Sequence, residues 1–174
     1  VDKRGLCYFA LMMRTPELPK FFIEIGTNIR DTLLPLAHRG WRGIMVEPAR
    51  YYYDQLERVE GVCYENVAIA EDERRRVLYR LDEKSIPQSG ENEWMHGIGT
   101  LLPKEQHEMK AIRQHPRFDS FIVEEEVECM TLNALIMKHR VKKIDFLKVD
   151  AEGYDCIILK SYDFRIKPDL IKVE

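Results

Sequence analysis

The stretch that most constrains the fold is residues 21–31, which read FFIEIGTNIRD. It begins with a short apolar run of the kind that forms a strand buried on both faces, and one acid, Glu24, interrupts that run near its end. Gly26 follows, and glycine can adopt a positive φ and let a ligand approach the backbone closely. Asp31 fits the N-cap of a helix over residues 32–39. A strand, a glycine turn and a helix start form the unit that binds nucleotide-like cofactors in doubly wound α/β sheets.

A second acid follows the next apolar run. Residues 44–46 are predicted to form another buried strand, which ends in Glu47, and Pro48 stops it there. Glu47 lies 47 − 26 = 21 positions after Gly26. A carboxylate about 20 residues past a glycine turn accepts hydrogen bonds from ribose hydroxyls. A surface acid at a strand end is the alternative, and the spacing from Gly26 favours the ribose ligand.

The turn itself narrows the kind of nucleotide. Dinucleotide sites use G-x-G-x-x-G, in which the later glycines admit a pyrophosphate and let the helix pack on the strand. Here Asn28 and Asp31 stand in those places, so a pyrophosphate would meet side chains. Glu24 beside the turn suits a ligand with a positive amino or sulfonium group. We therefore predict S-adenosylmethionine as the cofactor, and an NAD-dependent oxidoreductase is disfavoured.

The composition limits the number of domains and the kinds of ligand and site that the chain can have. The 174 residues are enough for one domain, which we place at residues 21–174 after a lead-in at 1–20. A net charge of −3 gives no basic field for nucleic acid, and no apolar run reaches the roughly 20 residues of a membrane span. The four cysteines lack C-x-x-C spacing, so neither a zinc site nor a disulfide framework is indicated. We expect a cytoplasmic protein with reduced thiols and no bound metal.

Strands and helices alternate along most of the chain, which predicts a mostly parallel sheet with helices on both faces. The further parallel strands are predicted at residues 62–67, 146–149 and 170–174, and the further helices at residues 49–60, 131–138 and 154–161.

The alternation of strands and helices is interrupted between residues 71 and 132. Residues 77–81 and 121–129 each alternate with a period of two, which predicts an inserted antiparallel strand pair. Between them, residues 88–100 are polar and glycine-punctuated, as in lids and binding loops, and a short helix is predicted at 104–115. His96 in this loop could act as a general base, although a solvated loop histidine is at least as common.

Further polar residues follow two of the predicted parallel strands. Asp150 and Glu152 come directly after the strand at 146–149. Paired acids there could position a sulfonium and an acceptor hydroxyl, hold a divalent ion, or cap the next helix. Asn66 and Val67 end the third strand, where an adenine would lie in this architecture, and an ordinary strand end is an equally good reading.

Six blocks of the sequence together resemble, in order, the motifs of FkbM-type methyltransferases, and the resemblance covers residues 21–174. The blocks are FIEIGTNI at 22–29, VEP at 46–48, NVAI at 66–69, GTLL at 99–102, CMTLN at 129–133 and IDFLKVDAEG at 144–153. The resemblance implies a class I Rossmann-like methyltransferase fold that uses S-adenosylmethionine. By the same resemblance, the cofactor's methionine end lies at Glu24, Gly26, Thr27 and Asn28, its ribose at Glu47, its adenine at Asn66 and Val67, and the methyl-transfer mouth at Asp150.

The resemblance also implies O-methylation of a small-molecule acceptor such as a sugar or polyketide. Asp150 or Glu152 is expected to orient the donor or accept the hydroxyl proton, with His96 as the reserve base. Arg30 departs from the family, which usually has glycine there.

The predicted sheet also ends at its fifth strand, so the C-terminal strands that usually complete such a sheet are expected to be missing and one edge to be open. We consider a homodimer through that open edge. A non-catalytic binding module of the same fold is the alternative to an enzyme.

Overall fold

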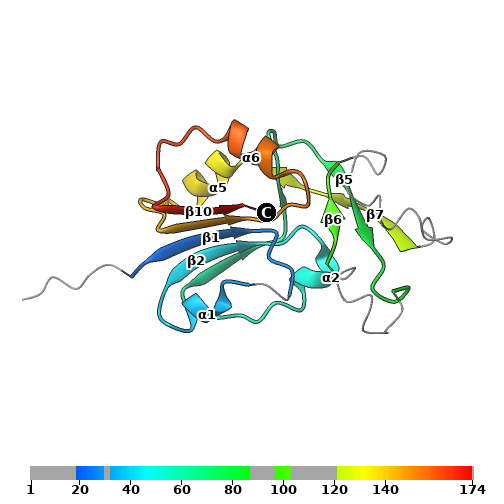
Figure 1. The fold of residues 1–174 in the computed structure, drawn as a ribbon, viewed down its shortest axis with the longest axis horizontal. Coiled ribbons are helices and arrows are strands. Elements are labelled where there is room, and N and C mark those ends of the chain that lie inside the picture. The colour runs from blue at the N-terminus through cyan, green and yellow to red at the C-terminus, as the bar shows by residue number, and fades with distance from the viewer. Residues whose placement is uncertain (1–18, 30–31, 87–96, 103–120, 174) are drawn as a thin grey trace, which may run out of the picture.

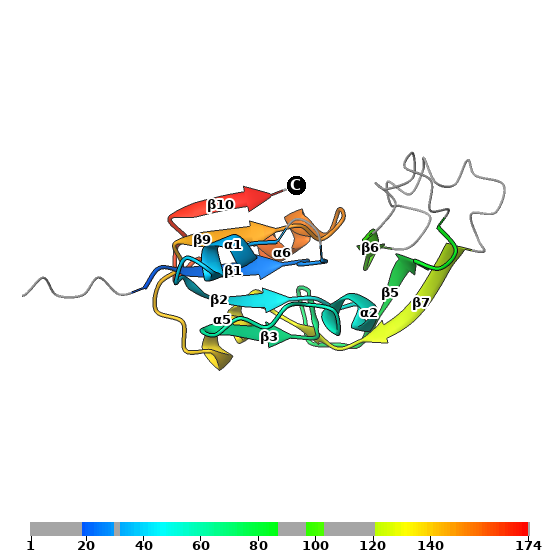
Figure 2. The same cartoon turned by 90° about the horizontal axis from the view of Figure 1, so that it is seen from below.

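The computed structural model describes residues 19–29, 32–86, 97–102 and 121–173. Five strands form a fully parallel sheet in the order β10-β9-β1-β2-β3 (Figure 2). Their bounds are β1 Phe21–Ile25, β2 Arg42–Val46, β3 Val62–Glu65, β9 Phe146–Val149 and β10 Leu170–Val173. The predicted α/β architecture with a parallel sheet is therefore confirmed.

Helices cover both faces of this sheet (Figure 1). They are α1 Leu34–Ala37, α2 Arg50–Tyr53, α5 Leu132–Lys138 and α6 Asp155–Ser161. The face carrying Ile23 and Ile25 packs against α5 and α6, whereas Phe22 of the same strand packs toward α1. Because side chains alternate along a strand, both faces of β1 are buried, and this explains why every residue of β1 except Glu24 is apolar.

A second, smaller sheet lies beyond the carboxyl ends of the parallel strands (Figure 2). It is antiparallel, with the order β6-β5-β7, and it consists of β5 Arg76–Leu81, β6 Gly99–Thr100 and β7 Ile122–Val127. The predicted antiparallel pair is confirmed, and β6 adds a third strand that was not predicted. A short parallel pair, β4 Ala68–Ile69 with β8 Cys129–Met130, lies between the two sheets in the chain path.

Glu125 of β7 stands between Val123 and Val127 in a row of alternate residues that is otherwise apolar. In the structure its carboxylate binds the Nε of Arg80 on β5 at 2.9 Å, and both side chains are largely buried. A charged residue can face inward there because its partner stands on the neighbouring strand.

The helix predicted over residues 49–60 is wrong in length, because α2 spans only Arg50–Tyr53. The guanidinium of Arg58 lies 4.4 Å from the ring centre of Tyr53 and 4.3 Å from that of Tyr64, and it donates to the Tyr53 carbonyl at 2.9 Å. After α2 the N–H groups of Gln55 and Leu56 bond three residues back, to the carbonyls of Tyr52 and Tyr53, so the helix ends in tighter turns. The helix predicted over 32–39 is likewise shorter, and Pro35 lies in its first turn, where a missing N–H donor is best tolerated.

Several expectations concern residues outside the described ranges. They are the lead-in up to residue 18, Arg30, the Asp31 cap, His96, and the helix at 104–115. Within the described residues, no helix is both long enough and apolar enough to cross a bilayer.

β10 forms one edge of the sheet, and its side chains are exposed. Leu170, Ile171 and Val173 are 58%, 37% and 39% exposed, respectively. An exposed apolar edge strand can pair with another chain. The homodimer through this edge stays a prediction.

Candidate functional site

The ends of β1, β2 and β9 are tied together by main-chain hydrogen bonds. The backbone N–H groups of Gly26 and Thr27 both donate to the Val46 carbonyl, at 3.0 and 3.1 Å. On the other side, the Asp150 N–H donates to the Ile25 carbonyl at 3.0 Å. The carboxyl ends of three adjacent strands therefore have fixed positions relative to one another.

Gly26 allows this close approach. Its φ is +74°, and a Cβ at this position would lie 1.7 Å from the carbonyl oxygen of Asp150. The sequence predicted a glycine that could adopt a positive φ, and the structure confirms that φ. The close neighbour in the structure is the chain's own carbonyl.

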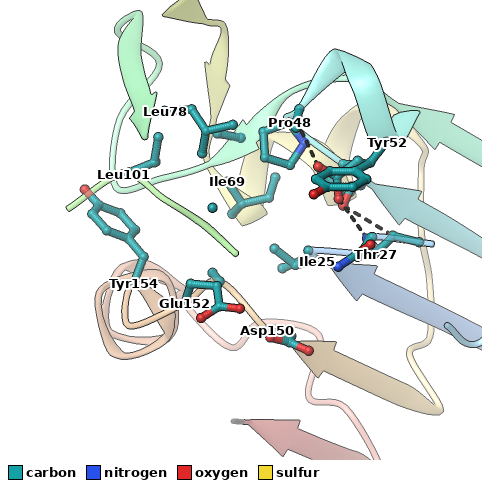
Figure 3. Close-up of a pocket in the computed structure, with 18 of the residues that line it drawn as sticks. Ile25, Thr27, Pro48, Tyr52, Ile69, Leu78, Leu101, Asp150, Glu152 and Tyr154 are labelled. Carbon is teal, nitrogen blue, oxygen red and sulfur yellow. Dashed lines mark hydrogen bonds between the residues drawn. The ribbon is translucent and has the colours of Figure 1, made fainter. Parts of the chain in front are cut away.

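A cavity of about 400 Å³ opens at these strand ends. Figure 3 shows Asp150 and Glu152 on one side of it, across from the apolar side chains of Ile69, Leu78 and Leu101. Three carboxylates line the cavity, because Glu47 joins the other two, and no Lys or Arg is found among its described lining residues. Such a lining suits a ligand that combines an apolar ring system with hydroxyl and cationic groups.

Glu47 is almost fully buried at the end of β2. Its two carboxylate oxygens accept hydrogen bonds from the backbone N–H groups of Asn28 and Ala49, each at 2.8 Å. Burial raises the pKa of Glu47 to about 7, and the nearby carboxylates of Glu125 and Asp150 act in the same direction, while the two backbone donors oppose the rise. The Glu47 side chain therefore changes charge near neutral pH.

The turn after β9 is held from two directions. The carboxylate of Asp155 accepts hydrogen bonds from the N–H groups of Ala151 and Gly153, at 2.9 and 3.1 Å. The hydroxyl of Thr100, on β6, donates to the carbonyl of Glu152 at 2.9 Å. Glu152 itself has a φ of +50°, which a non-glycine residue adopts only where its surroundings enforce it.

Two tyrosines line the cavity and hold its outer wall. The Tyr52 hydroxyl donates to Glu83 and accepts from the N–H of Gly97 at 2.9 Å, and burial raises the pKa of Tyr52. The Tyr154 hydroxyl donates to Glu71 at 2.6 Å, and burial raises the pKa of Tyr154 to about 12. Both phenols are therefore neutral donors at physiological pH.

Most of the described residues predicted for the site line this one cavity. These are Gly26, Thr27, Asn28, Glu47, Val67, Asp150 and Glu152. Two predicted residues, Glu24 and Asn66, do not line it. The Nδ2 of Asn66 donates to the carbonyls of Glu47 and Pro48, at 2.9 Å each, and so supports the end of β2.

Glu24 lies in the protein interior with no exposed surface. One carboxylate oxygen lies 3.2 Å from the Nζ of Lys148 on β9, and the other accepts a hydrogen bond from the Leu33 N–H at 2.9 Å. Sequence reasoning placed Glu24 directly beside the ligand, whereas the structure places it beneath the turn.

Sequence reasoning did not single out several lining residues, among them Leu78, Leu101 and Tyr154. Leu78 is apolar, although the residues on the same face of its strand, Arg76 and Arg80, are charged. This exception was the sequence signal that Leu78 is buried. Leu101 follows the two-residue strand β6, which is too short for a periodic pattern to show.

One alternative reading of the Asp150 and Glu152 pair was a divalent-ion site. Among the residues that the structure describes, no group of three or more His, Cys, Asp or Glu side chains is placed to hold a metal ion.

Comparison with known families gives one match. The model of the methyltransferase FkbM domain matches residues 24–174, which is most of the chain. No curated protein and no solved structure matches the sequence.

Proposed function

Since the chain belongs to the FkbM methyltransferase family, we propose that it transfers a methyl group from S-adenosylmethionine to a hydroxyl oxygen of a small molecule such as a sugar or polyketide. The observation that carries the proposal is the meeting of three carboxylates with an apolar wall in one cavity at the carboxyl ends of parallel strands. A non-catalytic module would need none of these acids at that place.

The residues present fit S-adenosylmethionine. The cofactor carries two positive groups and one carboxylate, and the described lining carries three acids and no Lys or Arg. Lys148, which does not line the cavity, lies 3.6 Å from one of these acids, Asp150. The apolar side chains of Val67, Ile69 and Leu78 offer a surface for the flat adenine. When bound, the cofactor supplies a methyl group that is already activated on a sulfonium.

Glu47 is the proposed ribose ligand. Each of its carboxylate oxygens accepts one backbone hydrogen bond, from Asn28 or Ala49, and these bonds fix the plane of the carboxylate. A carboxylate oxygen can accept more than one hydrogen bond, so Glu47 retains capacity for the two ribose hydroxyls.

Asp150 and Glu152 are the proposed acceptor-side residues. Their carboxylates line the cavity on the side away from the apolar wall (Figure 3). One of them orients the acceptor hydroxyl and takes its proton while that oxygen gains the methyl group. The surrounding walls exclude water and align the two reactants, and this alignment is the protein's main contribution to the rate. His96 as a reserve base stays a prediction.

Calorimetric titration with S-adenosylmethionine tests the proposal. Glu47→Ala is expected to weaken binding at least about tenfold, because ribose hydroxyls lose a charged acceptor. Glu65→Gln is the matched control, since Glu65 ends the neighbouring strand β3 but binds Lys138 and His139 outside the cavity. Equal affinities for the wild type and Glu47→Ala would remove Glu47 from the site.

A further inference from the structure

Lys148 is a buried charge in the middle of the parallel sheet. Its side chain is 2% exposed, and it stands on β9 directly opposite Glu24 of β1 in the strand register. The Nζ of Lys148 lies 3.2 Å from a carboxylate oxygen of Glu24, whose side chain has no exposed surface. A buried lysine is rarely found without a carboxylate beside it, and here the partner is on the adjacent strand.

The same ammonium also lies near an acid of the cavity wall. The Nζ of Lys148 lies 3.6 Å from a carboxylate oxygen of Asp150, two residues further along the chain. The Asp150 side chain is 25% exposed and lines the cavity. Lys148 therefore lies between an acid in the protein interior and an acid on the cavity wall.

The fold alone gives little reason for this arrangement. Neighbouring side chains on the α1 face of the sheet are apolar, among them Phe22, Met45 and Phe146. Replacing a buried ion pair by apolar residues of similar volume is often neutral or even stabilising. An apolar pair at positions 24 and 148 would thus satisfy the packing. The bond from the Leu33 N–H gives Glu24 a structural role, but it does not require a lysine at position 148.

We propose that Lys148 is a positioning residue, whose ammonium, held in place by Glu24, fixes the carboxylate of Asp150 at the cavity wall for methyl transfer. The proposal rests on the role proposed above for Asp150. Glu24 is itself fixed, because its second oxygen accepts the Leu33 N–H at the start of α1. The chain of contacts therefore runs from the base of α1, across β1 and β9, to the cavity.

The test uses a double variant, Glu24→Leu with Lys148→Met, which removes one negative and one positive charge and leaves the net charge unchanged. Equilibrium unfolding in urea first establishes that the variant is folded. A crystal structure then shows the Asp150 side chain, and calorimetry gives the affinities for S-adenosylmethionine and for its neutral demethylated product. We expect Asp150 to leave its wild-type position and the preference for the cationic ligand to fall about fivefold.

Two further variants make the result specific. Lys143→Met with Asp145→Asn removes a lysine–aspartate pair at the opposite end of the same strand and is expected to leave the ligand preference unchanged. Asp150→Asn is expected to lower the preference by a similar amount, and adding the double substitution to it should cause no further loss.

The outcomes distinguish the proposed role of Lys148 from that of Asp150. An unmoved Asp150 together with an unchanged ligand preference in the folded double variant would overturn the role of Lys148. If Asp150 moves but Asp150→Asn leaves both affinities unchanged, Asp150 makes no favourable contact with the sulfonium, while the positioning by Lys148 stands. If the variant Glu24→Leu with Lys148→Met does not fold, the same measurements are made on Glu24→Gln with Lys148→Gln. Failure of both pairs to fold would make Lys148 a folding residue and also overturn the proposal.

Discussion

Two regions enclose the cavity, and they are built in different ways. The base consists of the turns at residues 26–28, 47–49 and 150–153, and the roof consists of the antiparallel strands β5, β6 and β7. Main-chain hydrogen bonds join the turn after β1 to the ends of β2 and β9. The roof is joined to the parallel domain largely by side chains, such as Tyr52 to Glu83 and the Arg50 N–H to Glu125.

This difference separates two tasks. A main-chain hydrogen bond does not depend on side-chain identity, so the junction of the turn after β1 with β2 and β9 persists under most substitutions. A roof joined by side chains can change with single substitutions, and loops around a rigid scaffold are where binding specificity usually varies. We infer that the base, with Glu47, Asp150 and Glu152, carries the polar groups that every transfer needs, and that the roof completes the cavity and can vary with the acceptor.

The largest expected effect is on the base. Gly26→Ala would place a Cβ 1.7 Å from the Asp150 carbonyl and also impose a positive φ on alanine. We expect a loss of about 3 kcal/mol or more in the free energy of unfolding, together with loss of cofactor binding, measured by urea unfolding and calorimetry.

Gly40→Ala is the matched control for that prediction. Gly40 has a φ of +86°, but a Cβ there would meet nothing within 4 Å. Only the backbone strain remains, about 1 kcal/mol, and cofactor binding should not change. Equal losses in the two variants would mean that the close approach of the two turns contributes nothing.

The second prediction concerns pH. The pKa of Glu47 is raised from 4.5 to about 7 in the folded state, so the folded protein binds this proton more tightly than the unfolded chain does. The contribution to stability is therefore greatest below pH 4.5, falls as the pH rises toward 7 and is constant above it, with a total change on the order of 3 kcal/mol. Glu47→Gln lacks this titration, so the difference between the two unfolding curves, measured from pH 4.5 to 8, isolates it.

Cofactor binding should have the opposite pH dependence. Ribose hydroxyls bind the ionised carboxylate more strongly, so affinity for S-adenosylmethionine should rise with pH through about 7 in the wild type and stay flat in Glu47→Gln. A flat wild-type profile would mean that Glu47 keeps one charge state across this range.

The base was largely predictable from the sequence, and the reason is physical. A glycine turn after a buried strand, with acids at the ends of two neighbouring parallel strands, can meet at only one edge of such a sheet. The predicted residues Gly26, Glu47 and Asp150 accordingly line one cavity. The inward burial of Glu24 could not be read in the same way, because it depends on Lys148, which lies 124 positions away.

The roof was predictable only in outline. The period-two pattern predicted strands at 77–81 and 121–129, which the structure has at Arg76–Leu81 and Ile122–Val127. It did not predict the third strand or the contacts that attach the roof. Tyr52 illustrates the limit, since it is the middle one of three consecutive tyrosines and no local pattern indicates which of the three rings lines the cavity. Its bonds to Glu83 and Gly97 join segments that no local pattern connects.

The third prediction concerns a substitution that weakens the attachment of the roof. Tyr52→Phe removes the hydroxyl that binds Glu83 and the Gly97 N–H, and the expected loss in the free energy of unfolding is about 1 to 2 kcal/mol. Cofactor affinity should fall less than in Gly26→Ala, because the base is intact. Tyr51→Phe is the control, since Tyr51 is 40% exposed and its ring stays in place. A loss of binding as large as that of Gly26→Ala would show that roof and base act as one unit.

The smallest expected effect lies within the roof itself. Arg80 and Glu125 are 13% and 22% exposed and 2.9 Å apart across β5 and β7, so a double-mutant cycle with Arg80→Met and Glu125→Gln should give a coupling of about 1 kcal/mol. The exposed pair Arg74 and Asp72 should couple more weakly, because water screens it. Affinity for S-adenosylmethionine should be unchanged in Arg80→Met, since neither member of the inner pair lines the cavity. A clear loss of cofactor affinity there would contradict the division of tasks, because a contact wholly within the roof would then determine the shape of the base.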